Sequence, residues 1–341
     1  MKKIVSFGEL MLRLKSLQKE RFLQSPSFEA EFGGSEANVC VSLANFGKSV
    51  MFVSAFPKNI LGLQAANSLK KFGVEVNALY KDGRLGLYFL EDGACQRPSQ
   101  VIYDRENSVF SLSLPDEFDW SSIFRDASWF HISGITPAIS ENAYLCAKKA
   151  IEEAKKNNLT VSLDLNYRKK LWKYGRECVS VMKDFASKVD VLIANEEDIQ
   201  KCLGLELDDF VTPTESYKHL ALKVKQNYPN LKYVAITLRH SYSADKNGWQ
   251  AFLLGESGFY ESCYYDINNI VERVGAGDSF AAALIYGLTE FSSEKNGEQK
   301  ALDFASSASC LKHSIPGDFN LISKEEVFAL MNGSSNGRIQ R

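Results

Sequence analysis

The sequence lacks the features that mark several large classes of protein. It has no run of 18 uncharged apolar residues, which argues against a membrane-spanning helix. Its 40 Lys and Arg are matched by 42 Asp and Glu, so it lacks the basic excess typical of phosphate-neutralising nucleic-acid binders. Glu9 and Arg13 interrupt the first apolar run too early for a signal peptide. We therefore expect a cytoplasmic protein with neither nucleic acid nor membrane as a partner.

Metal-binding and disulfide patterns are also missing. The seven cysteines are odd in number and widely spaced, with no C-x-x-C pair, which favours reduced thiols over a disulfide framework. The four histidines never form H-x-x-x-H, so a zinc site is not expected. One of them, His131, lies within an apolar run and is interpreted as a core histidine.

The remaining composition is that of an ordinary globular chain. Of its 341 residues, 45% are hydrophobic and 24% are charged. This length allows one large α/β domain, with or without a smaller appendage, or two domains. Short apolar runs predict buried strands at 3–7, 50–55, 128–133, 159–165, 189–194 and 232–238.

Helical patterns lie between or after most of these runs. Residues 140–157 repeat apolar side chains at helical spacing, and Ser140 is a suitable N-cap. Similar faces predict helices over 277–288 and 301–312, whereas the polar stretch 292–300 predicts a surface loop. Strands that alternate with helices indicate a mostly parallel sheet covered on both faces.

One region breaks this pattern. Residues 85–91 and 100–104 flank Asp92-Gly93, a hairpin turn signal. We expect a small antiparallel insertion here, joined by strands within 11–32. A small sheet with one apolar face needs something to cover, which a ligand site or a partner subunit would provide.

The strongest chemical motif is the glycine-rich stretch 274–280. Gly275, Ala276 and Gly277 let a ligand approach the backbone, and a following helix would turn its free N–H groups and positive dipole end toward an anion. Asp278 is either satisfied by that dipole or acts as a base beside a bound phosphate. The stretch matches neither the G-x-G-x-x-G nor the Walker A pattern.

Three weaker groups accompany this motif. Gly33-Gly34 precedes a helical pattern, as either a ligand approach or a tight strand–helix turn. Residues on the hairpin would clamp an acidic small molecule or would form a solvated edge strand: Tyr88, Arg97, Tyr103 and Arg105. Polar residues follow three predicted strands, where open parallel sheets bind ligands: Asp164, Asn166, Arg168, Asn195, Glu196, Asp198, Thr237 and Arg239.

Together these motifs resemble the ribokinase-like (PfkB) carbohydrate kinases over residues 3–330. The matching residues are Gly33-Gly34 with Asn38, then Asn195 to Asp198 at the position of N-x-x-E, then Gly275 to Asp278. The resemblance implies a three-layer α/β/α sandwich with a mostly parallel central sheet plus a small β-sheet lid. We accordingly expect a kinase domain over 1–330 with its lid from about 11–32 and 85–110, a flexible tail over 331–341, and a homodimer or higher oligomer formed through the lid.

Within the family, several stretches are similar to the kinases of 2-keto-3-deoxygluconate. They are 8–13, 86–91, 97–105, 164–172 and 313–320. The resemblance implies transfer of phosphate from ATP to the C6 hydroxyl, which gives 2-keto-3-deoxy-6-phosphogluconate. Two alternatives stay open: another sugar kinase of the family, such as a fructokinase or a related deoxy-keto-acid kinase, and a catalytically silent sugar- or nucleotide-binding protein.

The resemblance also assigns roles to individual residues. Asp278 would accept the hydroxyl proton, with the backbone of Gly275, Ala276 and Gly277 around the transferred phosphate. The sugar acid would contact Gly33, Gly34, Asn38, Tyr88, Tyr103, Arg105 and Arg168. ATP would contact Asn195, Thr237, Arg239, Gly248, Gly275, Gly277, Ala305, Ala308 and Gly317. Mg²⁺ would be held indirectly, through water, by Asn195 and Asp198. A monovalent cation is left open, because Glu272-Arg273-Val274 stands where the family usually has Asp-Thr.

Overall fold

The structure is a computed structural model that describes residues 2–333. Its centre is a large sheet in the order β13-β12-β11-β10-β9-β8-β1-β4-β5, with β14 also paired to β12. The strands from β5 to β11 run parallel, and β12, β13 and β14 form an antiparallel edge. The bounds are β1 Lys3–Phe7, β4 Val50–Pro57, β5 Glu75–Lys81, β8 Ala127–Ser133, β9 Thr160–Asp164, β10 Val191–Asn195, β11 Tyr233–Ser241, β12 Lys246–Leu254, β13 Phe259–Glu261 and β14 Tyr265–Asn268.

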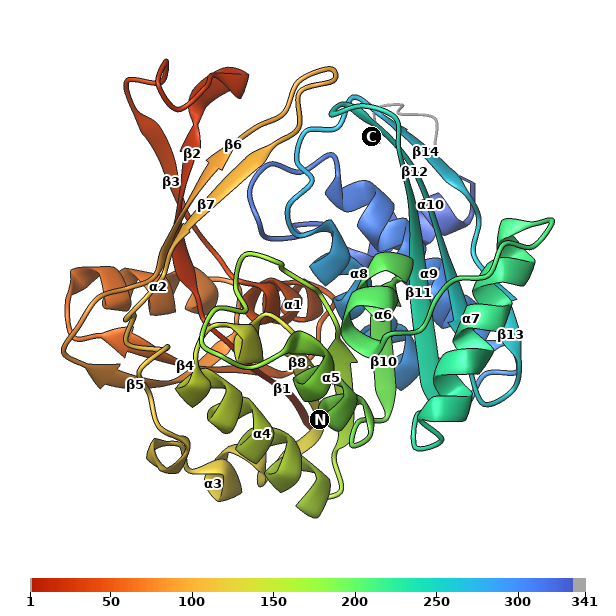
Figure 1. Cartoon of the computed structure of the whole chain (residues 1–341), viewed down its shortest axis with the longest axis horizontal. Helices are drawn as coiled ribbons and strands as arrows, with labels where there is room; N and C mark the ends of the chain where they lie inside the picture. Colours follow the sequence, from red (N-terminus) through yellow and green to blue (C-terminus); the bar gives the residue numbers. More distant parts are fainter. Residues whose placement is uncertain (1, 334–341) are drawn as a thin grey trace.

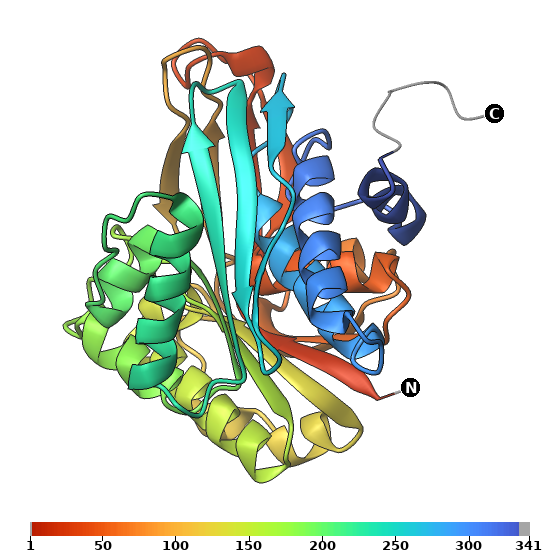
Figure 2. The same cartoon turned by 90° about the vertical axis from the view of Figure 1, so that its right-hand side faces the viewer.

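Helices cover both faces of this sheet, giving the expected three layers (Figure 2). One face carries α3 Trp120–Phe124, α4 Glu141–Lys156, α5 Cys178–Ala186, α6 Glu196–Leu203 and α7 Pro213–Asn227. The other carries α1 Ser35–Asn45, α2 Ile60–Lys70, α8 Ala276–Glu290, α9 Gly297–Lys312 and α10 Lys324–Met331. Short 3₁₀ turns occur at Leu17–Lys19, Pro115–Glu117 and Thr136–Ala138. Each face of the sheet therefore has its own hydrophobic core.

Local sequence explains these elements. The Ser140 side chain accepts a hydrogen bond from the N–H of Ala143 and caps α4, whose buried residues follow the predicted stripe. All eight residues of β4 are buried, as expected of a parallel strand covered on both faces. His131 is fully buried on β8, and its Nδ1 lies 2.9 Å from the Ser162 hydroxyl. The predicted fold class is confirmed.

A second, four-stranded sheet projects from the body (Figure 1). It is formed by β3 Phe28–Gly33, β2 Met11–Ser16, β6 Leu87–Glu91 and β7 Gln100–Asp104, in that order. The two hairpins are antiparallel, but β2 and β6 pair in parallel, so the sheet is mixed rather than antiparallel. Asp92-Gly93 opens a longer connection over 92–99 and is not a two-residue turn.

Other details differ from the sequence prediction. The antiparallel strands β12 to β14 and the edge strand β5 were not predicted. Helix α9 begins at Gly297, inside the predicted loop 292–300. Most of the predicted tail, 334–341, lies outside the described residues, and Met331 is the last residue of α10. Within residues 2–333, no helix is both long and apolar enough to cross a membrane.

Candidate active site

The loop before α8 forms an anion cradle. Gly275 has a φ of +81°, and an added Cβ would lie 2.1 Å from the carbonyl oxygen of Asp318, so both conformation and space require glycine. Within residues 2–333, the backbone N–H groups of Gly277 and Asp278 donate no hydrogen bond. They lie at the positive end of the 15-residue helix α8. Such an end binds phosphate groups readily.

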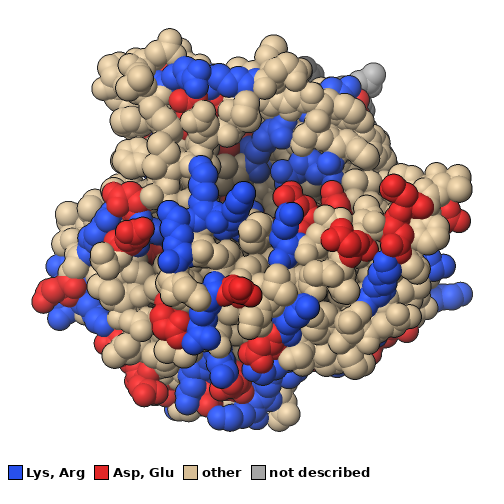
Figure 3. All heavy atoms as spheres, in the orientation of Figure 1, with Lys and Arg blue, Asp and Glu red and all other residues tan. Residues whose placement is uncertain are grey.

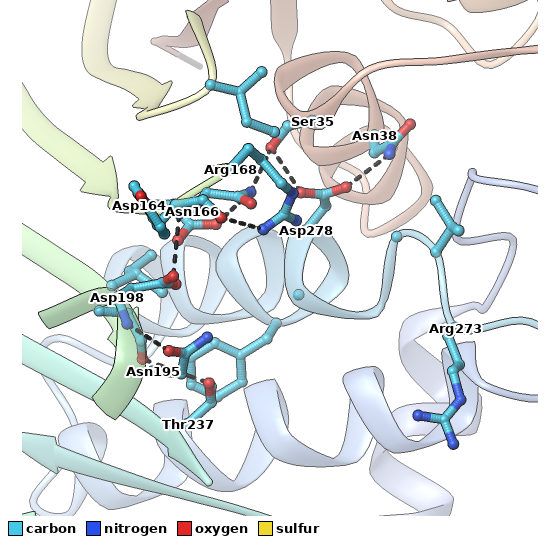
Figure 4. A pocket seen from close by; sticks show the side chains of 18 of the residues that line it. Ser35, Asn38, Asp164, Asn166, Arg168, Asn195, Asp198, Thr237, Arg273 and Asp278 are labelled. Atoms are coloured by element: carbon cyan, nitrogen blue, oxygen red, sulfur yellow. Dashed lines mark hydrogen bonds between the residues drawn. The ribbon is translucent and has the colours of Figure 1, made fainter. Parts of the chain in front are cut away.

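Asp278 lies on the first turn of α8 and is held by α1 (Figure 4). The Ser35 hydroxyl donates to its Oδ1 at 2.7 Å, and Asn38 Nδ2 donates to its Oδ2 at 2.7 Å. Burial raises the pKa of Asp278, whereas these two hydrogen bonds lower it. The result is an oriented carboxylate of raised basicity beside free N–H groups, an arrangement suited to a general base next to an anion site.

The double-glycine motif builds the opposite wall. Gly34 lies against the β1–β2 loop, and an added Cβ would lie 2.2 Å from the carbonyl oxygen of Glu9. Its N–H faces Asn38 Oδ1 at 3.4 Å, while the amide nitrogen of Asn38 donates to Asp278. Asn38 therefore connects the two glycine motifs, which explains why asparagine follows Gly34 by four residues.

The carboxyl ends of β9 and β10 add a third group. Asp164 and Asn195 are the last residues of these strands, and Asn195 pairs in register with Thr237 of β11. Asn195 Oδ1 accepts the N–H of Asp198 at 2.7 Å and caps α6. Asp198 Oδ1 in turn accepts the N–H of Tyr167 at 3.1 Å. The polar residues that follow separate strands thus meet at one edge.

Burial raises the pKa of two of these carboxyl groups. Burial raises the pKa of Asp198 to about 6. Burial also raises the pKa of Asp164 well above its ordinary value, and the charges of Asp198 and Asp278 raise it further. No group of three or more His, Cys, Asp or Glu that would enclose a metal occurs in residues 2–333. These oxygen donors fit a Mg²⁺ ion that is held mainly by phosphate and water.

These groups line one cavity of about 890 Å³ between the two sheets. Lys and Arg gather around this hollow (Figure 3). The cationic residues that line it are Arg168, Lys169, Lys201, Arg239 and Arg273. Of the residues predicted from sequence, the cavity brings together Gly34, Asn38, Tyr88, Tyr103, Arg168, Asn195, Asp198, Thr237, Arg239, Gly275, Gly277 and Asp278.

Other predicted residues lie outside the cavity lining. Ala305 and Ala308 are fully buried in the core against the sheet, so no surface of either reaches the cavity. Gly248 packs against the Tyr264 ring, where an added Cβ would lie 1.9 Å from the hydroxyl oxygen. The buried Ala276 accepts the Ser309 hydroxyl at its carbonyl oxygen. The two other glycines of this group, Gly33 and Gly317, approach Asp318 and Glu31.

Arg105 is also outside the lining, although sequence reasoning placed it on the substrate. It is 5% exposed, and its Nε and Nη2 bind Glu9 Oε2 at 2.7 and 2.6 Å. This buried ion pair engages two of the three guanidinium nitrogens, and the third, Nη1, is buried without a hydrogen-bond partner within residues 2–333. Arg168, by contrast, is exposed in the cavity and donates only to the backbone oxygen of Tyr167 within residues 2–333. Of the two arginines, Arg168 is the one available to an acidic ligand.

Sequence reasoning missed several lining residues. Ser35 follows Gly34 directly and is an obvious hydroxyl donor once the carboxylate it faces is known. Asp318 lies beside the lid, where Tyr88 Oη donates to its Oδ2 at 2.6 Å. Arg273 and Lys201 lie on elements that only the three-dimensional fold brings to the cavity. Asp318 falls in the stretch 313–320 and Arg273 in Glu272-Arg273-Val274, but the sequence assigns neither residue a ligand, and no motif marks Lys201.

Known proteins that resemble this chain were compared with it. The family described as pfkB family carbohydrate kinase matches residues 1–322. A 2-dehydro-3-deoxygalactonokinase of Haloferax volcanii is 31% identical over 337 residues, covering 98% of this chain and 98% of that protein. A 2-dehydro-3-deoxygluconokinase of Bacillus subtilis is 26% identical over 328 residues, covering 95% of this chain and 94% of that protein.

Solved structures agree with these sequence matches. The crystal structure of 2-dehydro-3-deoxygluconokinase from Thermotoga maritima has a TM-score of 0.92 to this chain at 46% identity, covering 98% of this chain and 100% of that one. The prefixes 2-dehydro and 2-keto name the same carbonyl group. The two glycine motifs, the cavity between two sheets and these matches lead to one conclusion. The chain belongs to the PfkB family of carbohydrate kinases, phosphotransferases that act on a sugar hydroxyl.

Proposed function

We propose that this enzyme transfers the γ-phosphoryl group of ATP to the C6 hydroxyl of 2-keto-3-deoxygluconate, giving 2-keto-3-deoxy-6-phosphogluconate. One observation carries the proposal: the Asp278 carboxylate lies beside free N–H groups at the start of α8, in a cavity of about 890 Å³. The likeness to the 2-dehydro-3-deoxygluconokinases of Thermotoga maritima and Bacillus subtilis supports the choice of sugar acid.

The chemistry follows from the cradle. Asp278 accepts the proton of the C6 hydroxyl as the oxygen attacks the γ-phosphorus, and the bond from the γ-phosphorus to the bridging oxygen of ADP breaks, so that ADP leaves. The N–H groups of Gly277 and Asp278 stabilise charge on the transferring phosphoryl oxygens. Ser35 and Asn38 keep the carboxylate aimed into the cavity, so that little reorganisation accompanies the transfer. Catalysis on this scheme is mainly positioning and charge stabilisation.

The nucleotide lies toward β10 and β11 in this proposal. Thr237 and Arg239 contact ATP, and the cationic side chains of the cavity offset its phosphate charges. Bound Mg²⁺ supplies charge neutralisation across the phosphates. Asn195 and Asp198 would hold it through water, with Asp164 as a neighbouring oxygen donor.

The substrate carboxylate needs a positive partner, and we assign Arg168. It lines the cavity and forms no ion pair in the described part of the chain. Tyr103 and Tyr88 lie on the small sheet above it and contribute the lid side of the sugar site. Closure of this lid would exclude water, which competes with the sugar as phosphoryl acceptor.

A second substrate has its own support. 2-Keto-3-deoxygalactonate differs from 2-keto-3-deoxygluconate by one inverted hydroxyl, and the Haloferax volcanii relative, 31% identical, is a 2-dehydro-3-deoxygalactonokinase. One inverted hydroxyl changes only one or two hydrogen bonds, so discrimination between the two acids depends on small differences in the pocket. Both acids therefore belong in the first assay.

A coupled assay of ADP release tests the function. The panel is 2-keto-3-deoxygluconate, 2-keto-3-deoxygalactonate and fructose, each with ATP and Mg²⁺. We expect the highest kcat/KM for the gluconate, a lower value for its epimer and little turnover of fructose. Preference for fructose would identify a neutral-sugar kinase instead. Tight binding of ATP without turnover of any sugar would identify a silent binding protein.

The lid also offers a surface for a second copy of the chain. Phe28 and Ile102 on the small sheet are 39% and 51% exposed, and Leu23 in the connection between β2 and β3 is 102% exposed. We therefore include a homodimer formed through this sheet in the proposal. Light scattering should give twice the chain mass for the wild type and a monomer mass for Ile102→Lys. A monomeric wild type would contradict it.

A further inference from the structure

The turn after α9 is built around a buried lysine. Lys312, the last residue of α9, has no exposed surface. Its Nζ donates to the carbonyl oxygens of Ile315 at 3.0 Å and Gly317 at 2.9 Å. Burying an ammonium group is costly unless its donors are satisfied, and here two backbone carbonyl oxygens accept hydrogen bonds from the buried ammonium.

This turn supports the anion cradle directly. The Val271 N–H donates to the carbonyl oxygen of His313 at 2.9 Å, joining the strand end before the cradle to the turn. A Cβ added to Gly275 would lie 2.1 Å from the Asp318 carbonyl oxygen and 3.3 Å from Lys312 Cε. Gly275, which precedes α8, therefore packs against Lys312 and against the turn that Lys312 holds. A shift of this turn would move Gly275 and the start of α8.

The charges around the lysine are already balanced. Arg13 binds Glu272 at 2.8 Å and Asp318 at 2.5 Å, and all three side chains are buried. Lys15 also binds Glu272 at 3.2 Å and Asp92 at 2.7 Å, so with Lys312 the cluster contains three cations and three anions. Burial lowers the pKa of Lys312 to about 8, although the carboxylates of Glu272 and Asp318 oppose that change.

The position of Lys312 also bears on whether a monovalent cation could bind at this turn. Such an ion would need inward-facing backbone oxygens near the glycine loop, and those of Ile315 and Gly317 are already occupied by the ammonium of Lys312. A further cation at these oxygens would touch an ammonium group and leave the buried cluster with an excess positive charge. The residues present do not fit a bound potassium or sodium ion.

We propose that Lys312 is a positioning residue that supplies this positive charge covalently, and so makes phosphoryl transfer independent of added monovalent cations. The inference rests on the proposed kinase function, because the cradle is what the lysine positions. Its charge adds to the positive end of α8, and its hydrogen bonds fix the turn beneath Gly275.

The first test uses the wild-type enzyme. Turnover is measured in tetramethylammonium salt and in potassium or sodium salt at equal ionic strength, so that screening is the same in each. We expect rates that agree within about twofold, since no site is available for the smaller ions. Stimulation well beyond that by potassium or sodium would overturn the proposal.

The second test replaces the lysine. Lys312→Ala empties the ammonium position, and Lys312→Met fills it with an uncharged chain. In tetramethylammonium salt we expect kcat to fall by roughly tenfold or more in both, with a smaller change in the KM for ATP. Potassium, ammonium or methylammonium should restore part of the activity of Lys312→Ala only. Lys300→Ala, on the same helix but paired with Glu294 at the surface, is the matched control.

A stability readout separates this inference from the proposed substrate. The Tm of Lys312→Ala should rise when potassium replaces tetramethylammonium, whereas the Tm of the wild type and of Lys300→Ala should not. This result needs no sugar, so it stands even if the panel of acids gives no turnover. Wild-type kcat in either Lys312 variant without added cation would refute the inference. An ion effect on the Tm of the wild type equal to that on Lys312→Ala would also refute it.

Discussion

Two sets of positive side chains border the cavity, and they differ in burial and in pairing. The first set is Arg13 and Lys15 on β2 of the small sheet: Arg13 is 1% exposed and pairs with Glu272 and Asp318, and the buried Lys15 pairs with Glu272 and Asp92. The second set is exposed or half-buried, and within residues 2–333 none of its members forms an ion pair with Asp or Glu: Arg168, Lys169, Lys201, Arg239 and Arg273.

The difference separates structure from binding. Burying an ion pair costs desolvation free energy, and removing one partner leaves the other charge buried and uncompensated. The paired, buried cations therefore hold the lid against the glycine loop. Cations that have no partner in a cavity can form new charge-assisted hydrogen bonds when an anionic ligand binds. The second set is therefore the candidate binding surface for phosphates and a carboxylate. The predictions below test this division.

The largest effect is expected at Asp278. Besides burial, the charge of the Asp318 carboxylate raises the pKa of Asp278 and the charge of the Arg168 guanidinium lowers it. Asp278→Asn keeps the shape of the side chain but removes the proton acceptor. We expect kcat to fall on the order of a thousandfold or more, with the Kd for ATP nearly unchanged. Steady-state kinetics and calorimetric titration with ATP measure the two quantities.

Ser35→Ala is the comparison for that variant. It removes one of the two hydrogen bonds on the carboxylate and leaves its charge, so its loss in kcat should be much smaller. If Asp278→Asn turned over substrate at nearly the wild-type rate, the general-base assignment would be wrong.

The next effect concerns the buried set. Burial alone would lower the pKa of Arg13, but the carboxylates of Asp318 and Glu272 raise it above its ordinary value. Arg13→Met would leave Asp318 without a cationic partner among the described residues and Glu272 with Lys15 alone at 3.2 Å, and we expect the free energy of unfolding to fall by about 3–5 kcal/mol in urea titrations. Arg84→Met breaks the exposed Arg84–Asp104 pair, at 2.7 Å, and should cost less than about 1 kcal/mol. Equal losses in the two variants would contradict the division.

Much of the fold could be predicted because its signals are local. The Ser140 cap and the apolar stripe of α4 depend on residues within one helix. The anion cradle could also be predicted, because Gly275 and the start of α8 lie next to each other in the sequence. The antiparallel strands β12 to β14 escaped prediction although their pairing is local, with Ser241 opposite Asn247 and Leu254 opposite Phe259, because neither connection carries a two-residue Asn-Gly or Asp-Gly turn.

The site was less predictable where a side chain has a distant partner. Arg105 was assigned to the substrate because nothing near it in sequence shows that Glu9 neutralises it. Ala305 and Ala308 lie on a well-predicted helix, yet which face that helix turns to the cavity depends on packing with α8. Asp318 and Lys312 meet the lid and the cradle only in three dimensions.

A smaller effect is expected in the exposed set. Arg168→Ala should raise the KM for 2-keto-3-deoxygluconate by roughly tenfold to a hundredfold, the range for one charge-assisted hydrogen bond pair, because it removes the proposed partner of the substrate carboxylate. The KM for a neutral sugar, if one is turned over at all, should change far less. Lys173→Ala is the control, since that lysine is exposed but does not line the cavity. Equal losses for acidic and neutral sugars would remove the carboxylate assignment.

The smallest effect is a pH dependence at Asp198. Burial raises the pKa of this carboxyl to about 6, against the opposing charge of Arg168 and with that of Glu197. As the pH falls through about 6 the carboxylate takes up a proton and loses its attraction for Mg²⁺. The Mg²⁺ concentration for half-maximal activity should therefore rise, by at most about tenfold per pH unit, and stay flat above pH 7. Asp198→Asn should abolish this rise, whereas Glu197→Gln should keep it. A Mg²⁺ requirement that stays constant from pH 7 to pH 5 in the wild type would show that this carboxylate does not help to hold the metal.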